Sequence, residues 1–490
     1  RPIASSAGPS LLTRASLAVM GTSLVWLRDD LRTADNPALT AAVETGDPVV
    51  VVYIHDEKSP GIRPLGGGTR WWLHHSLEAL SDKVARLGGQ LILRRGAAAD
   101  VLRTLIRETG VSAIYWNRRY GKPERDVDAG VKEYARAAGL EAASFQANLL
   151  YEPWTVRTGT GGPYTVFTPF WKSRINSPVP PRLPIAAPPA LLAPATQPAS
   201  DELESWGLLP TSPNWALGFP HRWTVGENGA HKALELFLST RLTRYARGRD
   251  FPSEQSTSEL SPHLRWGEIS PFQVWHATDE ARRGASAEVS TNAAKFLAEL
   301  GWREFSYHLL YHWPDLATVN FDARFDKFPW GEADPAVLEA WQQGRTGIPL
   351  VDAGMRELWQ TGSMHNRVRM VAASFLIKNL LIDWRVGEAW FWDTLVDADP
   401  ASNAASWQWV AGSGADAAPY FRVFNPMLQA EKFDPQNDYL NRYLGDFEHP
   451  LISGYPYPIV DLPTTRTRAL EAFATLADVP RAVRPPAMDL

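Results

Sequence analysis

The pattern of hydrophobic and polar positions divides the chain into two parts. Up to about residue 152, short apolar runs alternate with amphipathic segments of helical period. The runs LVWL, VVVVYIH, LILRR, AIYWN and EAASF begin at Leu24, Val49, Leu91, Ala113 and Glu141. Because this alternation is typical of a parallel, doubly wound sheet, we predict an α/β N-terminal domain over residues 22–152.

One segment between these runs predicts a long helix with a defined end. Residues 69–88, TRWWLHHSLEALSDKVARLG, have apolar positions at helical spacing and lead into Gly88 and Gly89, as helix ends commonly do. No GxGxxG motif or P-loop follows the first apolar run, so a dinucleotide or triphosphate site is not supported in this domain.

A proline-rich stretch separates the two parts of the chain. Eight prolines fall between Ser177 and Pro198, which excludes a regular helix or a central strand. We predict an interdomain linker over residues 153–225 that wraps the surface. Beyond it, segments such as ALELFLSTRL and MVAASFLIKNLLIDW predict an all-helical C-terminal domain over residues 226–490.

The first twenty residues contain Arg, Ser and Ala but no acidic residue, and Met20 directly precedes the first apolar run. A transit peptide, residues added by cloning and a start site placed too far upstream are the alternatives. We expect a disordered leader over residues 1–21, because the stretch is too weakly apolar for a secretory signal.

Composition narrows the class of protein. A chain of 490 residues with 44% hydrophobic content is long enough for two domains with substantial cores. The absence of cysteine excludes disulfides and thiolate-held metals or iron–sulfur clusters, and we predict no metal site. No apolar run reaches the roughly 18 residues of a membrane span, so we expect a soluble protein. The absence of cysteine is compatible with a reducing cytoplasm, where we expect the protein to act.

The net charge of −5 argues weakly against a partner as acidic as DNA, but global charge says little about one face. Basic residues do gather in two places. They are Arg241, Arg244, Arg247 and Arg249 in one stretch, and Arg367, Arg369, Lys378 and Arg385 in the other. Such runs are usually solvated, so a role in DNA binding depends on the motifs beside them.

The most informative segment runs from residue 395 to residue 424. Asp399 is placed to cap a helix and Pro400 to occupy its first turn. Asn403 and Trp407 then share one face, and Trp409 points roughly 200° away around the helix. One helix therefore presents two aromatic surfaces.

Two other segments have chemistry-bearing residues three and four positions apart, so each set shares a helix face. The sets are Asn366, Arg369 and Met370 in MHNRVRM, and Glu299, Trp302 and Arg303 in ELGWREF. Taken alone, each set is more often core packing or a solvated ion pair than a site.

Six motifs follow one another in a fixed order. They read RYARGRDFP, TSELSPHLRWGEISP, ELGWREF, GIPLVDAGMREL, HNRVRM and DADPASNAASWQW. In this order the chain, from Leu24 to Pro435, resembles the DNA photolyase and cryptochrome family, and within it the enzymes that repair cyclobutane pyrimidine dimers. The resemblance implies light-dependent repair of such dimers by electron transfer from excited, reduced FAD to a flipped-out dimer.

The resemblance also implies which residues contact the flavin in the helical domain. They are Tyr245, Thr257, Ser258, Glu259, Leu260, Ser261, Phe296, Glu299, Arg303, Asn366, Arg369, Asp397, Ala398, Asp399 and Asn403. The hydroxyls in TSELS suit the diphosphate, Arg303 supplies charge, and Arg369 can pair with Asp397. Capping, turn formation and an ion pair are the alternative roles.

Asn403 distinguishes repair from light sensing. Its amide can accept a hydrogen bond from the redox nitrogen of reduced flavin without adding negative charge, and plant cryptochromes typically carry Asp there. The choice of Asn favours a lyase.

For the lesion, the resemblance implies an apolar corner formed by Trp302 and Trp409. Glu299 and Asn366 would hydrogen bond to the base edges, with Glu299 protonated in a dry cavity, and Met370 would fill the remaining wall. The catalytic set is Glu299, Trp302, Asn366, Met370, Asn403 and Trp409. The DNA-binding set is Arg247, Glu299, Trp302, Arg303, Asn366, Arg367 and Trp409.

Trp407, Trp384 and Trp330 match the family's electron-transfer chain, with core packing as the alternative. A second, light-harvesting chromophore would be methenyltetrahydrofolate or 8-hydroxy-5-deazaflavin in the α/β domain, and the sequence is also compatible with none. We expect a monomer that acts on UV-damaged DNA without a membrane or an obligate protein partner. The alternatives in function are a cryptochrome-like photoreceptor and a generic α/β nucleotide-binding module without flavin.

Overall fold

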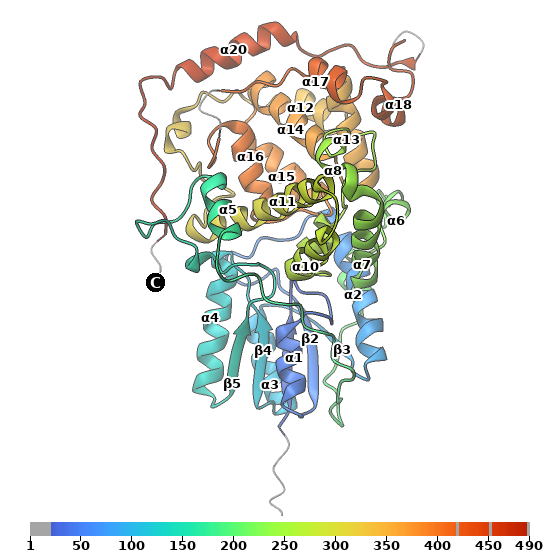
Figure 1. Cartoon of the computed structure of the whole chain (residues 1–490), viewed down its shortest axis with the longest axis vertical. Coiled ribbons are helices and arrows are strands. Elements are labelled where there is room, and N and C mark those ends of the chain that lie inside the picture. Colours follow the sequence, from blue (N-terminus) through green and yellow to red (C-terminus); the bar gives the residue numbers. More distant parts are fainter. Residues whose placement is uncertain (1–20, 418–420, 450–452, 488–490) are drawn as a thin grey trace, which may run out of the picture.

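The computed structural model describes residues 21–417, 421–449 and 453–487. The expected leader therefore lies almost entirely outside the described residues. Two layers are stacked along the long axis of the molecule, with a sheet and its helices at one end and a larger group of helices at the other (Figure 1).

The sheet forms from the five apolar runs. The strands are β1 (Ser23–Leu27), β2 (Val49–His55), β3 (Leu91–Arg95), β4 (Ala113–Asn117) and β5 (Glu141–Phe145). All pairs are parallel and the order is β3-β2-β1-β4-β5, with Ser23 opposite Val49 on one side and Ala113 on the other. The predicted parallel sheet is confirmed.

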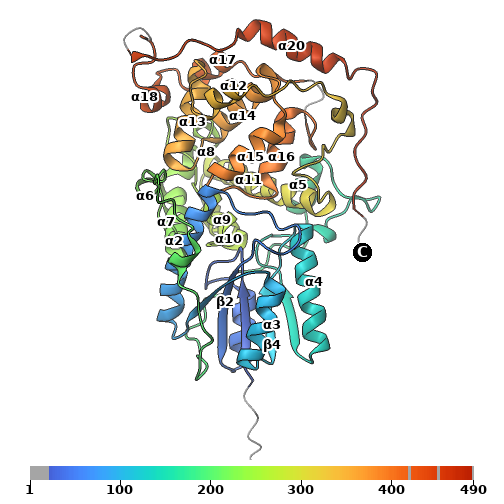
Figure 2. The same cartoon turned by 180° about the vertical axis from the view of Figure 1, so that it is seen from behind.

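Helices cover both faces of the sheet. They are α1 (Pro37–Glu44), α2 (Gly67–Arg86), α3 (Ala98–Thr109) and α4 (Lys122–Ala137). Since strand side chains alternate between faces, Val25 and Val51 pack with α1 and α2, whereas Trp26 and Val52 pack with α3 and α4. Figure 2 shows α3 and α4 on the face turned away in Figure 1. The fold is doubly wound, as predicted.

The predicted helix over residues 69–88 is α2. It begins two residues earlier, and Gly88 follows its end with a φ of +91°. At such a φ any side chain is strained, so glycine suits this helix end.

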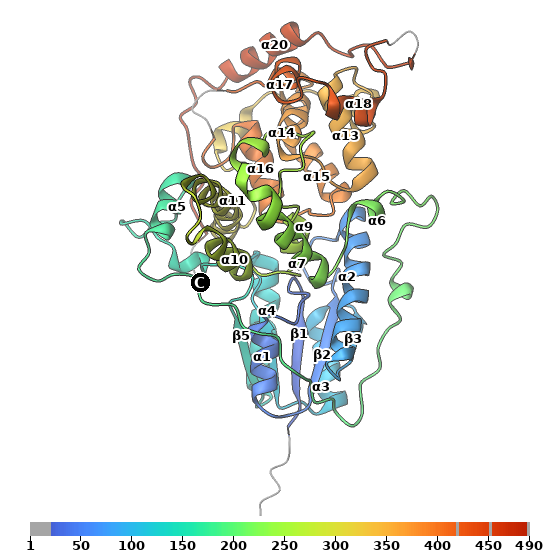
Figure 3. The ribbon, with the colours of Figure 1, turned by 45° about the vertical axis from the view of Figure 1, so that its right-hand side comes forward.

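The chain between the two domains runs over the surface of both domains. It contains two short helices, α5 (Phe167–Ile175) and α6 (Phe219–Arg222). The proline-rich part has no regular secondary structure, as predicted, and its backbone hydrogen bonds to Asp35, Val49 and Leu87. Figure 3 shows this segment running along the side of the sheet before it reaches α6.

The described residues beyond 226 form helices and loops, with one isolated β-bridge between Asp322 and Val483. The helices are α7 (Glu227–Leu236), α8 (Tyr245–Gly248), α9 (Ser261–Arg265), α10 (Pro271–Arg282), α11 (Ala287–His312), α12 (Pro335–Gln342), α13 (Pro349–Thr361), α14 (Asn366–Ser374), α15 (Trp384–Thr394), α16 (Ser402–Ala411), α17 (Pro426–Phe433), α18 (Asp438–Leu444) and α20 (Leu462–Ala474). This confirms the predicted helical domain.

The helical domain docks on the loop after β1, at the carboxyl end of the sheet. Arg32 donates to the carbonyl of Gly267 over 2.9 Å, and Glu227 accepts from the amides of Thr33 and Ala34 at 2.9 and 3.0 Å. Gly267 has a φ of +64°, and a Cβ atom there would meet the carbonyl oxygen of Asp29 at 2.0 Å. Glycine therefore permits the close approach of the two domains.

Candidate functional site

Helix α16 carries the central residues of the site. Asp399 Oδ1 accepts from the amides of Ala401 and Ser402 at 2.9 and 2.7 Å, so Asp399 caps these amides, although α16 begins at Ser402 and its N-cap residue is Ala401. Trp407 is buried, whereas Trp409 is partly exposed and donates to the carbonyl of Asp416 over 3.1 Å. Trp407 lies inside one hydrophobic cluster and Trp409 packs against the same cluster, so the two rings differ in exposure more than in their neighbours.

Three helices pack against α16 and bring the predicted sets together. These are α11 with Glu299, Trp302 and Arg303, α14 with Asn366, Arg369 and Met370, and α15. The same helices are seen grouped inside the helical domain in Figure 3. Sets separated by up to about a hundred positions in the sequence therefore surround one helix.

The amide of Asn403 is held by Glu388 of α15. Asn403 Nδ2 donates to the backbone carbonyl of Glu388 over 3.1 Å and to its carboxylate over 2.9 Å. Arg63, from the α/β domain, forms two parallel hydrogen bonds with that carboxylate, at 2.8 and 2.9 Å. Glu388 is only 3% exposed, and its ion-pair partner comes from the other domain.

The acidic residues ahead of α16 are each held in place. Arg369 pairs with Asp397 at 2.9 Å, as the sequence suggested. Tyr307 donates its hydroxyl to Asp399 over 2.8 Å, and Arg265 donates to the carbonyl of Ala398 over 2.8 Å. Burial raises the pKa of Tyr307 well above its usual value, and the charge of Asp399 acts in the same direction.

Aromatic rings form one wall near these residues. Tyr245 and Phe296 meet edge to face, with ring centroids 5.4 Å apart, and Phe237 packs on Phe296 at 4.4 Å. Both predicted residues are buried. Phe237 is an additional member of this wall that the sequence analysis did not name.

The segment 257–261 lies directly before and at the start of α9. Thr257 and Ser258 are half-buried, Ser261 is exposed and Leu260 is buried. Glu259 has a φ of +60° and pairs with Arg222 at 2.9 Å and Arg241 at 3.4 Å. Two arginines thus hold the one acid of the segment.

Arg303 is anchored through backbone oxygens. Its guanidinium donates to the carbonyl of Asn148 over 2.7 Å and lies 5.0 Å from the ring centre of Tyr307. Arg303 therefore links α11 to the end of the α/β domain.

The surroundings of Glu299 differ from the dry cavity we expected. Its side chain is 26% exposed and forms ion pairs with Arg249 and with Lys295. The carboxylate sits between two cations at the surface of α11, so the expected dry surroundings are not those of this structure.

The aromatic residues predicted for the lesion also have protein partners. Trp302 stacks on Phe167 of α5, with ring centroids 3.8 Å apart and planes inclined by 10°. At most one face of Trp302 can therefore receive a base. Asn366 is exposed and its amide lies 3.9 Å from the sulfur of Met370.

The two arginines predicted to bind DNA differ in exposure. Arg247 is exposed. Arg367 pairs with Asp250 at 2.6 Å and covers the ring of Phe433.

The three tryptophans of the predicted chain belong to one hydrophobic cluster. Trp407 and Trp384 are buried in it, and Trp330 packs at its edge. Phe391 meets the ring of Trp407 at 4.9 Å, and Trp384 donates to the side chain of Asn320 over 2.9 Å. Shared packing is compatible with both electron transfer and a structural role.

Burial shifts the pKa of several ionisable groups around this centre. The pKa of Glu304, beside Arg303, rises to about 7 because the carboxyl is desolvated, although the charge of Arg303 opposes the shift. Desolvation lowers the pKa of Lys378 to about 7 and that of His365 to about 4.

A cavity of about 430 Å³ lies where the two domains meet. It is lined by Leu65, Gly67, Arg70, Trp215, Phe219, Leu358, Trp359, Asp393 and Thr394. The rings of Trp215 and Trp359 are 6.1 Å apart, and Trp390 stacks parallel to Trp359. Its walls combine aromatic surface with one cation and one acid.

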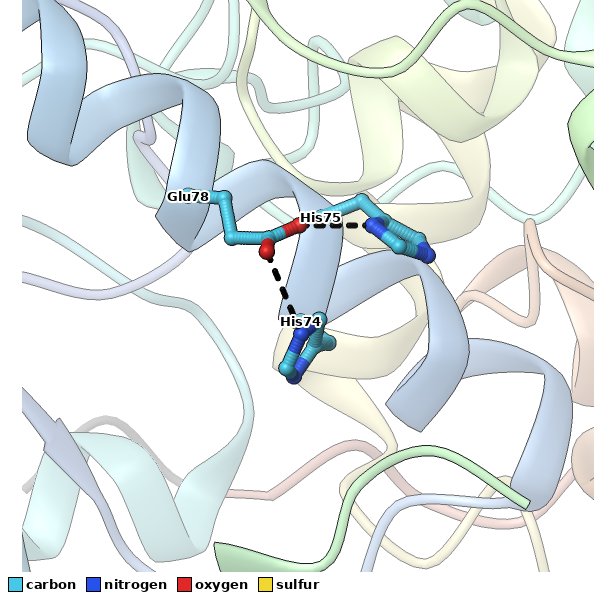
Figure 4. A group of neighbouring side chains, drawn as sticks. All are labelled: His74, His75 and Glu78. Atoms are coloured by element: carbon cyan, nitrogen blue, oxygen red, sulfur yellow. Dashed lines mark hydrogen bonds and ion pairs between the residues drawn. The ribbon is translucent and has the colours of Figure 1, made fainter. Parts of the chain in front are cut away.

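Among the described residues, one group offers ligand atoms close enough for a metal ion, His74, His75 and Glu78 of α2, with these atoms within 4.8 Å of one another. Figure 4 shows the carboxylate of Glu78 reaching toward both imidazoles, at 3.5 Å from His74 and 2.7 Å from His75. Ion pairing between these side chains explains the arrangement.

No helix in the described part of the chain is long and apolar enough to cross a membrane.

Two family models match the chain. Residues 23–188 match the DNA photolyase model, and residues 296–453 match the FAD binding domain of DNA photolyase. A deoxyribodipyrimidine photo-lyase from Agrobacterium fabrum is 51% identical over 92% of this chain and 98% of that protein. The chain belongs to the DNA photolyase family.

Other members of the photolyase family extend the comparison. The crystal structure of a bacterial class III photolyase from Agrobacterium tumefaciens has a TM-score of 0.90 and 48% identity, covering 95% of this chain and 100% of that one. Cryptochrome-1 from Arabidopsis thaliana is 35% identical over 95% of this chain and 72% of its own length. The family resemblance and the fold class expected from the sequence are both confirmed.

Several residues that shape this photolyase-family site were not found from the sequence. Glu388 and Tyr307 hold Asn403 and Asp399, and Arg63 holds Glu388. The spacing of Tyr307, four residues after Arg303 and eight after Glu299, could have indicated that Tyr307 belongs to the site, because all three share a helix face. No local signal could have indicated Arg63, which is 325 positions from Glu388.

Proposed function

We propose that this protein is a deoxyribodipyrimidine photo-lyase, which uses light to split cyclobutane pyrimidine dimers in DNA. The observation that carries the proposal is the grouping around α16. This helix presents Asn403 and Trp409, and it packs against the helices that carry Glu299, Trp302 and Asn366. The identity of 48% over 95% of the chain also supports the class of the Agrobacterium tumefaciens structure.

The residues fit FAD by the chemistry of their donors and acceptors. Both amide hydrogens of Asn403 go to Glu388, which leaves its oxygen as an acceptor for a flavin nitrogen. Arg303, Arg369 and the hydroxyls of residues 257–261 would hold the diphosphate and sugar, and Tyr245 and Phe296 would line the pocket. Bound FAD would supply the electron that the excited, reduced flavin lends to the dimer.

For the lesion, we propose that the free face of Trp302 and the ring of Trp409 hold a flipped-out dimer. Each stacked base is worth roughly 1–3 kcal/mol, which offsets part of the cost of unstacking it from the duplex. Glu299 and Asn366 would hydrogen bond to the base edges. Glu299 would exchange its ion pairs with Arg249 and Lys295 for the dimer. Met370 would fill the wall beside Asn366. Arg247 and Arg367 would contact the DNA backbone.

We further propose that a second, light-harvesting chromophore occupies the cavity between the domains. A flat ring could pack between Trp215 and Trp359, whose centroids are 6.1 Å apart and would separate to admit it. Arg70 and Asp393 would bind polar groups at the cavity edge. For a folate-type molecule, this cavity is a better match than a site within the α/β domain. Trp359→Ala should remove any absorption at wavelengths longer than those of tryptophan that is not due to flavin.

Repair of a thymine-dimer oligonucleotide under blue light tests the main proposal. Photoreduced protein should repair the dimer, and no repair should occur in the dark. Glu299→Ala should slow repair at least about tenfold, because it removes a hydrogen bond to a group that gains charge. Glu288→Ala, at an exposed site on the same helix, is the matched control and should leave repair unchanged.

A photoreceptor of the cryptochrome type is the second candidate, supported by the 35% identity to Cryptochrome-1. It would bind and photoreduce flavin without repairing the oligonucleotide. We also propose that the protein acts in the cytoplasm as a monomer, so gel filtration with and without damaged DNA should show the mass of one chain per lesion.

A further inference from the structure

A strap from the α/β domain reaches α15, the helix that packs against α16 and carries Glu388. The strap comprises residues 56–66, between β2 and α2. Its Arg63 lies 4.1 Å over the ring of Trp392, and Trp392 donates to the carbonyl of Pro64 over 2.9 Å. A Cβ atom at Gly66 would meet the carbonyl oxygen of Trp392 at 2.2 Å, so the strap lies directly against the end of α15.

The position of Arg63 gives it a single ionic partner among the described residues. Its two terminal nitrogens each contact one oxygen of the Glu388 carboxylate, at 2.8 and 2.9 Å. This bidentate geometry is the strongest form of an arginine–carboxylate pair, and here one partner is almost fully buried.

The two hydrogen bonds to Glu388 fix the orientation of the Asn403 amide. Both groups of Glu388 that face Asn403 are acceptors, one a backbone carbonyl and the other a carboxylate oxygen. The NH2 group must therefore point at Glu388, because a flipped amide would place oxygen against oxygen. The amide oxygen is consequently the atom offered to a ligand.

We propose that Arg63 is a positioning residue for the flavin: its two hydrogen bonds hold the Glu388 carboxylate against Asn403, and this fixes the amide with its oxygen outward. This inference rests on the proposed function, since it concerns the flavin partner. Without Arg63, the Glu388 carboxylate would lose the two hydrogen bonds that orient it. Asn403 would then keep only the backbone carbonyl of Glu388 as a fixed acceptor, so the orientation of its amide would be held less strongly.

The orientation of Asn403 favours one flavin oxidation state over the other. The N5 atom of reduced flavin carries a hydrogen and needs an acceptor, whereas N5 of oxidised flavin is itself an acceptor. An outward oxygen therefore stabilises the reduced form, and an outward NH2 group stabilises the oxidised form. Arg63 thus links the α/β domain to the retention of reduced flavin.

The rate at which photoreduced flavin returns to its oxidised form in air, followed by absorption in the dark, tests the proposal. Arg63→Met keeps an unbranched side chain but removes the charge, together with the guanidinium group that lies over Trp392. It should speed reoxidation about three- to tenfold, the range expected for one hydrogen bond. Arg63→Lys restores the positive charge and should stay within about twofold of the wild type.

Arg118→Met is the matched control. Arg118 also pairs with a largely buried glutamate, Glu152, and lies near a tryptophan ring, but it does not contact Glu388 or Asn403. Its replacement should change the unfolding temperature without changing reoxidation. Glu388→Gln provides an independent variant, because its amide can donate as well as accept, and it should also speed reoxidation.

Reoxidation of Arg63→Met within twofold of the wild type, with flavin bound, would overturn the proposal. Equal acceleration in Arg63→Met and Arg63→Lys would also overturn it, since packing and not charge would then be responsible. Wild-type protein that purifies without flavin would instead overturn the proposed function, and this inference with it.

Discussion

Glu304 is an unusual residue because its carboxyl group is buried while one of its oxygens has no hydrogen-bond partner among the described residues. It lies beside Arg303 on α11, is 3% exposed, and accepts from the amide of Tyr151 over 3.2 Å through one oxygen. Burial raises its pKa from 4.5 to about 7, which indicates that the folded protein holds this group protonated at mildly acidic pH.

This pKa shift predicts how stability depends on pH. Below pH 4.5 the proton is bound in both states, and the stabilisation is fully present. It is lost as pH rises through about 7, because only the unfolded chain ionises freely. Glu304→Gln should therefore gain about 3 kcal/mol relative to the wild type between pH 4.5 and pH 8.

Urea unfolding at several pH values measures this difference. Glu288→Gln, at an exposed position of the same helix, should show no comparable change. A stability difference between Glu304→Gln and the wild type that stays constant over this pH range would contradict the assignment.

Trp407 allows the electron-transfer role to be separated from packing. Trp407→Phe should slow photoreduction of oxidised flavin at least about tenfold, whereas chemically reduced protein should lose far less repair activity. Trp266→Phe, which shortens a buried ring in a different cluster, is the control. Equal photoreduction in Trp407→Phe and the wild type, measured by flavin absorption under blue light, would assign Trp407 to packing alone.

At the scale of the element, the start of α16 combines two functions. Asp399 accepts two backbone amides and the hydroxyl of Tyr307, so it ends one loop and ties it to α11. Asp399→Ala should cost about 1–3 kcal/mol of unfolding free energy, since it removes a cap and leaves a buried hydroxyl unpaired.

Asp399→Asn is the conservative partner for this test. An asparagine caps nearly as well and can still accept from Tyr307, so it should lose less than half as much stability. Equal losses in the two variants, measured by chemical denaturation, would show that the charge matters more than the cap.

The elements themselves were largely predictable, and the reasons are local. Strands such as Val49–His55 are continuous apolar runs. Asp399 and Pro400 indicate that a helix begins close by. The partners of site residues were less predictable. Phe167 stacks on Trp302 from a helix that lies more than a hundred positions earlier, and spacing within α11 carries no information about it.

At the scale of the whole molecule, the two domains share polar contacts at the carboxyl end of the sheet. Glu227 of α7 is buried, accepts from Thr33 and Ala34, and pairs with Lys83 at 2.8 Å. Because these groups would be left without partners, Glu227→Ala should destabilise the protein by about 3–5 kcal/mol.

The same substitution should also change the form of unfolding. We expect one calorimetric transition for the wild type and two for Glu227→Ala, because the lost contacts join the domains. Glu235→Ala, at an exposed position of the same helix, should retain a single transition. A single, unshifted transition for Glu227→Ala would show that the domains are coupled elsewhere.

The contact between Arg63 and Glu388 has a consequence for recombining domains between relatives. An exchange at the proline-rich linker would transfer Arg63 with the first module and leave Glu388 with the second. Suppose the relative that supplies the first module has no cation at the position of Arg63. The chimera would then contain a well-folded first module but would retain reduced flavin less well. Transferring residues 56–66 together with α15 would preserve the pair of Arg63 and Glu388. The boundary between the two functional units therefore differs from the domain boundary at the linker.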